Sequence, residues 1–168
     1  SLLGFIGDAV AIVKKNLKKE KLDVVDIFSG SGIVSRYMKQ HSSKIIANDL
    51  EDYSYVLNKC YLSNKNDIDM DELISWYNYL KENLDGELND GIISEMYAPK
   101  DINNIKLGER CFYTTRNAKY IDTARQLIEN VPKQYRIYFL APLLTEASVK
   151  NNTSGVFKGF YKNSKTGI

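Results

Sequence analysis

Apolar residues recur along this chain either at helical spacing or in short strand-like runs, and the change from one pattern to the other marks the boundaries between predicted helices and strands. Residues 2–17 carry apolar side chains three and four positions apart, which predicts an amphipathic helix. Residues 24–28 and 44–49 contain short apolar runs of the kind found in buried strands. Helical spacing returns at 33–38 and 51–63. The first part of the chain therefore predicts a βαβα order with parallel strands.

Beyond these elements the periodicity is mainly helical. We expect helices over 69–84, 120–131 and 135–149, and a short strand over 92–97. Pro142 should kink or interrupt the last helix, because proline lacks the backbone N–H that a helix interior requires. Two clear strands are too few for a complete doubly wound sheet. The pattern therefore predicts part of an α/β fold with a helical insertion beside it.

Composition limits the classes of protein to which the chain can belong. Its 168 residues suffice for one domain, and a net charge of +2 implies no polyanionic partner by itself. The charge is uneven, because the segment from Lys150 to the end has lysines and no acid. No apolar run reaches the roughly 18 residues of a membrane span. Cys60 and Cys111 make no disulfide framework, so we expect reduced thiols in a cytoplasmic protein.

The turn after the first strand has the chemistry of a ligand-binding turn. Gly30 and Gly32 lack Cβ atoms, so the backbone can bend sharply and a ligand can approach it closely. The next helix directs free N–H groups to the same place, which favours a carboxylate or phosphate. Asp26 lies near the strand's carboxyl end, where open α/β sheets bind ligands. Residues 34–36 lack the third glycine of a dinucleotide fingerprint, which makes a nicotinamide dehydrogenase the least favoured alternative.

Asp49 ends the second predicted strand. A carboxylate at that place can accept hydrogen bonds from both hydroxyls of a ribose. The alternative role is an N-cap for the helical segment from Leu50 onward. The glycine turn on the neighbouring strand favours the ribose, so the two turns together predict one crevice for a nucleotide-type ligand.

Both turns resemble motifs of a known enzyme family. Residues 26–32, Asp-Ile-Phe-Ser-Gly-Ser-Gly, resemble the Asp-Pro-Phe-x-Gly-(Gly/Ser)-Gly signature of adenine-specific DNA methyltransferases of the Dam-like (D12) class. Residues 48–50, Asn-Asp-Leu, are similar to the Asn-Asp-(Leu/Ile) of that family's second strand. Residues 2–3 are similar to the helix after its Gly-(Gly/Ser)-Lys motif, and residues 155–163 to its Phe-Asn-Gly-x-x-Arg segment.

The chain departs from the family at several positions. Ile27 replaces a proline, Lys158 stands where asparagine is usual, and Lys162 stands where arginine is usual. The family's catalytic motif, Asp-Pro-Pro-Tyr, is absent, since no two of the chain's 3 prolines adjoin. We therefore nominate no catalytic residue, and we expect that motif beyond Ile168 in a longer protein of which this chain is an inactive fragment. His41 is the only histidine, which argues against a histidine base and against a histidine-rich metal site.

The resemblance implies a partial Rossmann-like sheet of an S-adenosylmethionine-dependent methyltransferase, with a mainly helical insertion. In such enzymes the first strand's motif holds the methionine part of S-adenosylmethionine, and the acid after the second strand holds its ribose. The residues thereby assigned to the cofactor are Asp26, Phe28, Ser29, Gly30, Ser31, Gly32, Asp49 and Leu50. The resemblance implies three segments. Residues 1–64 form a cofactor-binding α/β part, residues 65–150 form a mainly helical insertion that is part of the target-recognition region, and residues 151–168 form a basic DNA-contacting loop or hairpin.

The implied activity is methylation of adenine N6 at a specific site in double-stranded DNA, and a cognate restriction endonuclease is a further candidate partner. The candidate DNA-contacting residues are Lys158, Tyr161, Lys162 and Lys165 in the tail and Arg116 in the insertion. A solvated basic loop is the alternative for the tail, and packing is the alternative for Arg116. Two other functions stay open: a methyltransferase acting on RNA or a small molecule, and a non-catalytic DNA-binding or regulatory fragment.

Overall fold

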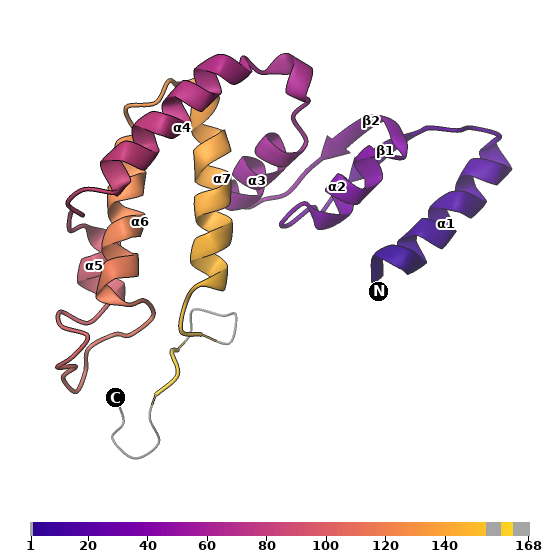
Figure 1. The fold of residues 1–168 in the computed structure, drawn as a ribbon. Helices are drawn as coiled ribbons and strands as arrows, with labels where there is room; N and C mark the ends of the chain where they lie inside the picture. The colour runs from indigo at the N-terminus through magenta and orange to yellow at the C-terminus, as the bar shows by residue number, and fades with distance from the viewer. Residues whose placement is uncertain (1, 154–158, 163–168) are drawn as a thin grey trace. The chain divides into compact units, whose positions relative to one another are not determined.

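The computed structural model describes residues 2–153 and 159–162 and divides the chain into two compact units, Ser1–Asp67 and Ile68–Ile168. The first unit contains α1 (Leu2–Leu17), β1 (Leu22–Asp26), α2 (Ile33–Lys39), β2 (Ser42–Ala47), α3 (Asp52–Tyr61) and the short 3-10 helix Lys65–Asp67 (Figure 1). The second contains α4 (Met70–Leu84), α5 (Ile92–Tyr97), α6 (Thr115–Ile128) and α7 (Lys133–Val149). None of the helices in the described ranges has the length and apolar content needed to cross a lipid bilayer.

The two strands pair in parallel, as the sequence predicts. Asp26 is in register with Ala47, so both strands end at the same edge of the sheet. β1 stops before Phe28 and β2 before Asp49, which shortens both predicted strands at their carboxyl ends. The residues that the sequence singles out after Asp26 therefore lie in turns at this edge, where a parallel sheet binds ligands.

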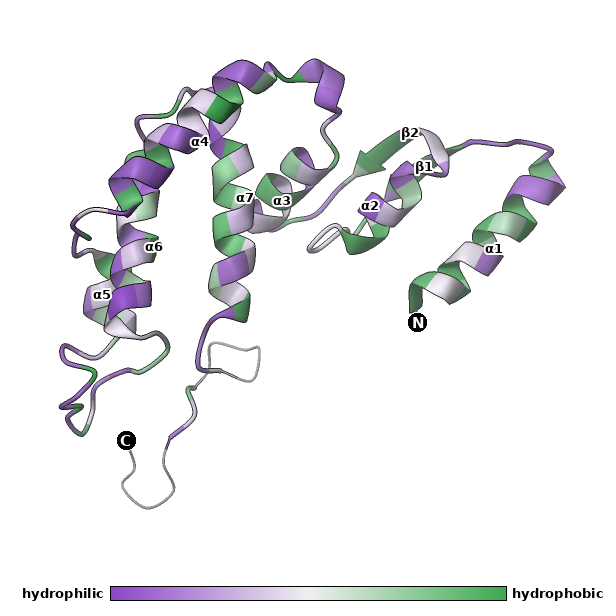
Figure 2. Ribbon diagram, viewed as in Figure 1, coloured by the Kyte–Doolittle hydropathy of each residue, from purple (hydrophilic) through white to green (hydrophobic). Residues whose placement is uncertain are grey.

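One face of the sheet is covered by helices. Val10 of α1, Leu22 of β1 and Met38 of α2 form a buried cluster on that face. Val25 and Ile46, which pair across the two strands on the opposite face, are 60% and 47% exposed. Apolar residues of the strands are thus exposed to solvent within the described part of the chain. Figure 2 shows by its green colour how apolar β2 is. The prediction of fully buried strands is wrong here, because these helices cover one side only.

The second unit is built on a cluster shared by α4, α6 and α7. Its buried residues are Leu80, Ile128, Val131 and Tyr135. Asp69 is the N-cap of α4, at the start of the helix predicted over 69–84, because its carboxylate accepts hydrogen bonds from the first backbone N–H groups of that helix. α7 continues as one helix through its internal proline, so of the two effects expected there, a kink or an interruption, the interruption does not occur.

Residues 92–97 form the helix α5 and not the predicted strand. The N–H of Gly91 donates to Ser94 Oγ at 2.8 Å, and this contact closes the first turn. Asp122 of α6 accepts from the N–H groups of Ile93 and Ser94 at 3.0 and 2.7 Å. A short apolar run is compatible with either structure. The carboxylate of a residue distant in sequence satisfies the helix N-terminus and so decides between them.

Candidate cofactor-binding site

The ends of β1 and β2 bring the two predicted turns into contact. The backbone N–H of Gly30 donates to Asp49 Oδ2 at 2.7 Å, and the N–H of Glu51 donates to Asp49 Oδ1 at 3.1 Å. Glu51, and not Asp49, is the N-cap of α3, so the capping alternative for Asp49 does not hold. Each carboxylate oxygen can accept more than one hydrogen bond. The half-buried Asp49 side chain therefore keeps acceptor capacity for the hydroxyl groups of a ligand.

These contacts shift the ionisation of Asp49. The Gly30 N–H is the largest cause that lowers the pKa of this carboxyl, followed by the Glu51 N–H, while partial desolvation acts in the opposite direction. Hydrogen bonds from backbone donors favour the charged form. The ionised carboxylate thus links the two turns.

We expect this link to weaken in acid. Because the pKa of Asp49 is lower in the folded chain, its stabilising effect is complete above the unfolded pKa of about 3.9 and is lost as the pH falls through the folded value. Denaturant unfolding measured from about pH 6 to about pH 3 should show a shallower loss of stability in Asp49→Asn than in the unmodified chain. Equal slopes would exclude this contribution.

The glycine turn has one open and one closed side. Gly30 and Gly32 both have positive φ angles, +50° and +76°. A Cβ added at Gly30 would meet no atom within 4 Å, whereas one added at Gly32 would lie 2.5 Å from Asn58 Oδ1. The turn is therefore packed against α3 at Gly32, whereas the space that a side chain would occupy at Gly30 is open. A free side is what a ligand that approaches the backbone needs.

The other predicted cofactor residues fall into two groups. Phe28 and Leu50 are 88% and 95% exposed, and Ser31 is also exposed. Ser29 is buried, and its hydroxyl donates to the carbonyl of Asn48 at 3.1 Å, so it supports the turn from behind. The carboxylate of Asp26 is directed to α2, where it accepts from the Ser35 hydroxyl at 2.6 Å.

Two residues of this site were missed by the sequence analysis. Ser54 and Asn58 of α3 are 0% and 7% exposed and contact the glycine turn. Ser54 Oγ donates to the carbonyl of Gly30 at 2.6 Å, and Asn58 Nδ2 donates to Ser29 Oγ at 3.0 Å. The available signal was a polar pair four positions apart directly after Asp49. The apolar spacing that predicts a helix over 51–63 includes Tyr53 instead, which is 47% exposed.

The predicted DNA-contacting residues of the described ranges are accessible. Arg116 is exposed in the first turn of α6 and lines a groove of about 340 Å³ with Asn117, Tyr120 and Lys150. In the tail, Tyr161 is 64% exposed and the Lys162 ammonium lies 5.2 Å from the centre of the Phe160 ring. The predictions for Lys158 and Lys165 fall outside the described residues, as does most of the 155–163 segment.

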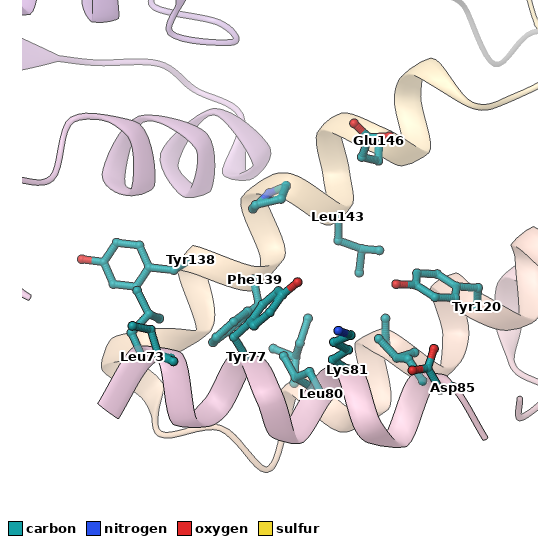
Figure 3. A pocket seen from close by; sticks show the side chains of 15 residues that line it. Leu73, Tyr77, Leu80, Lys81, Asp85, Tyr120, Tyr138, Phe139, Leu143 and Glu146 are labelled. Carbon is teal, nitrogen blue, oxygen red and sulfur yellow. The ribbon is translucent and has the colours of Figure 1, made fainter. Parts of the chain in front are cut away.

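A larger pocket, of about 530 Å³, lies between α4, α6 and α7 (Figure 3). Its walls are mainly aliphatic and aromatic, with Tyr77 and Phe139 among the lining residues, and none of the predicted site residues lines it. Neither Asp49 nor the glycine turn, on which the cofactor prediction depends, is part of this pocket. In the described ranges, no group of three or more His, Cys, Asp or Glu side chains could hold a metal ion.

Comparison with known proteins identifies the family. Residues 8–167 match the model of the D12 class N6 adenine-specific DNA methyltransferases. This chain belongs to that family. It is 34% identical over 150 residues to the type II methyltransferase M.NlaIII of Neisseria lactamica, an alignment that covers 83% of the chain and 41% of that protein. It is 28% identical over 185 residues to the type II methyltransferase M.CviAII of Paramecium bursaria Chlorella virus 1, with 97% and 50% covered.

A third relative extends the same pattern. The modification methylase StsI of Streptococcus sanguinis is 31% identical over 152 residues, which cover 82% of the chain and 22% of that methylase. The D12 chain thus spans half or less of the length of these curated relatives. No solved structure matches it significantly.

Proposed function

We propose that this D12 chain supplies the S-adenosylmethionine-binding part of a site-specific DNA adenine-N6 methyltransferase. The observation that carries the proposal is the contact between Gly30 and Asp49, which unites the glycine turn and the strand-end acid in one site. Family membership supports the same assignment, because the match extends over nearly the whole chain.

The residues present fit the cofactor. The space beside Gly30 is open, and Asp49 keeps acceptor capacity for the hydroxyls of the ribose. The glycine turn receives the amino-acid end, as the likeness to the family implies. Phe28 and Leu50 are exposed apolar side chains on the two neighbouring turns, suited to contact the adenine.

The bound cofactor supplies an activated methyl group, and this chain binds and orients it. Methylation of the target adenine requires the family's catalytic Asp-Pro-Pro-Tyr motif, which this chain does not contain. Holding the methyl donor in a fixed orientation contributes to catalysis without a nucleophile of the protein.

Double-stranded DNA is the proposed substrate of the whole enzyme. Arg116, Tyr161 and Lys162 are exposed and suited to contacts with phosphates or bases, and Lys158 and Lys165 belong to the same proposal. A cognate restriction endonuclease and a cytoplasmic location complete the proposal, the first by analogy with the type II relatives.

Substitution of the ribose acceptor tests the cofactor assignment. Asp49→Ala should weaken binding of S-adenosylmethionine by about tenfold or more in titration calorimetry, because charge-assisted hydrogen bonds to the ribose are lost. Asp52→Ala is the matched control, since Asp52 is an exposed acid close by in the chain and should leave the affinity unchanged.

The outcomes separate the candidate functions. Unchanged affinity in a folded Asp49→Ala chain would remove Asp49 from the site. Salt-sensitive DNA binding without any binding of S-adenosylmethionine would favour the non-catalytic DNA-binding fragment instead.

A further inference from the structure

The carbonyl group of Gly30 is held by α3. It accepts a hydrogen bond from Ser54 Oγ at 2.6 Å and a longer one from Asn58 Nδ2 at 3.4 Å. Both donors are buried, and the amide of Asn58 is itself fixed by donating to the carbonyl of Ser54 at 2.9 Å and to Ser29 Oγ at 3.0 Å. The direction of this carbonyl is therefore set by two side chains outside the glycine motif.

The same contacts set the direction of a backbone donor. The Gly30–Ser31 peptide is trans, as are all peptide bonds in the described ranges, so its N–H points opposite to its C=O. With the carbonyl directed to α3, the N–H of Ser31 points away from that helix. Ser31 is exposed, and no hydrogen bond to another described residue occupies this N–H. The N–H is a free donor beside the open space at Gly30.

We propose that Ser54 and Asn58 are positioning residues that lock the Gly30–Ser31 peptide so that the Ser31 N–H faces the carboxylate of the methyl donor's amino-acid end. A lock is needed because glycine adopts positive and negative φ with similar ease, which lets the adjoining peptide reverse. A reversed peptide would present a carbonyl oxygen to the carboxylate, and the two would repel each other. This inference rests on the proposed function, since it assigns a role toward that cofactor.

Two ligands that differ in one part test the lock. S-adenosylhomocysteine carries the amino-acid end, whereas 5′-methylthioadenosine has the same nucleoside without it. Ser54→Ala should weaken binding of S-adenosylhomocysteine by about tenfold in titration calorimetry and change that of 5′-methylthioadenosine by less than about twofold. Asp49→Ala should weaken both, because the ribose is common to them. Ser43→Ala, an exposed serine on β2, should affect neither.

A second variant and a second measurement protect the test against a folding defect. Asn58→Ala should show the same selective loss, and the Ser31 amide resonance of the unmodified chain should shift with S-adenosylhomocysteine but not with 5′-methylthioadenosine. Equal weakening of both ligands, or of neither, would overturn the positioning role while leaving the proposed function intact. An unmodified chain that binds neither ligand would overturn the proposed function and this inference with it.

Discussion

Gly32→Ala should destabilise the chain much more than Gly30→Ala. Both glycines have positive φ, so each substitution carries the cost of about 1–2 kcal/mol for an L-residue in the left-handed region. At Gly32 the new Cβ would also lie 2.5 Å from Asn58 Oδ1, and overpacking of a buried site adds about 1–3 kcal/mol. At Gly30 the new methyl group meets open space. Urea unfolding of the two variants measures the difference directly.

This pair of variants isolates one contact, because chemistry and backbone region are the same at both positions. Equal losses of stability would mean that Asn58 moves aside at little cost and that α3 does not hold the turn rigidly. Replacing Asn58 by alanine in the Gly32→Ala background should recover part of the loss, since the clashing oxygen is then absent.

Asp122→Ala should cause the other large effect, in the second unit. The carboxylate is 7% exposed and accepts the N–H groups of Ile93 and Ser94 at the start of α5. Its removal leaves two donors at a helix N-terminus without their partner, which we expect to cost about 2–4 kcal/mol. Denaturant unfolding followed by far-ultraviolet circular dichroism measures this loss.

Two further variants serve as comparisons for the stability of Asp122→Ala. Asp90→Ala removes an acid that pairs with Lys119 at 2.9 Å on the surface, and such a pair contributes less than about 1 kcal/mol. Asp122→Asn keeps one acceptor oxygen and should lose less than the alanine variant. If Asp122→Ala were as mild as Asp90→Ala, the N-terminus of α5 would be satisfied without α6.

Much of the cofactor site follows from local sequence rules. A strand that leads into Gly30 and Gly32, and a second strand that leads to Asp49, suffice to predict parallel pairing and a shared edge. Ser54 and Asn58 escaped prediction because a polar residue within a helix is usually solvated, and its burial depends on what the helix faces.

The helical unit shows the limits of periodicity more clearly. The run 92–97 is short and apolar, and its conformation depends on Asp122, a residue far along the chain. The partly open sheet has a related cause, since a strand's sequence records that a face is apolar but not which element covers it.

The amino-acid sequence alone established the order of strands and helices in the first unit, the glycine turn, the acid that follows β2, and the family likeness that the comparison confirmed. Those features depend on residues that are close together in the chain, so the spacing and the type of these residues are enough to determine them. Tertiary structure alone decided that a side chain of α3 donates a hydrogen bond to the Gly30 carbonyl and that a side chain of α6 caps α5. Such contacts join groups whose sequence separation is large, so no local pattern encodes the meeting of donor and acceptor.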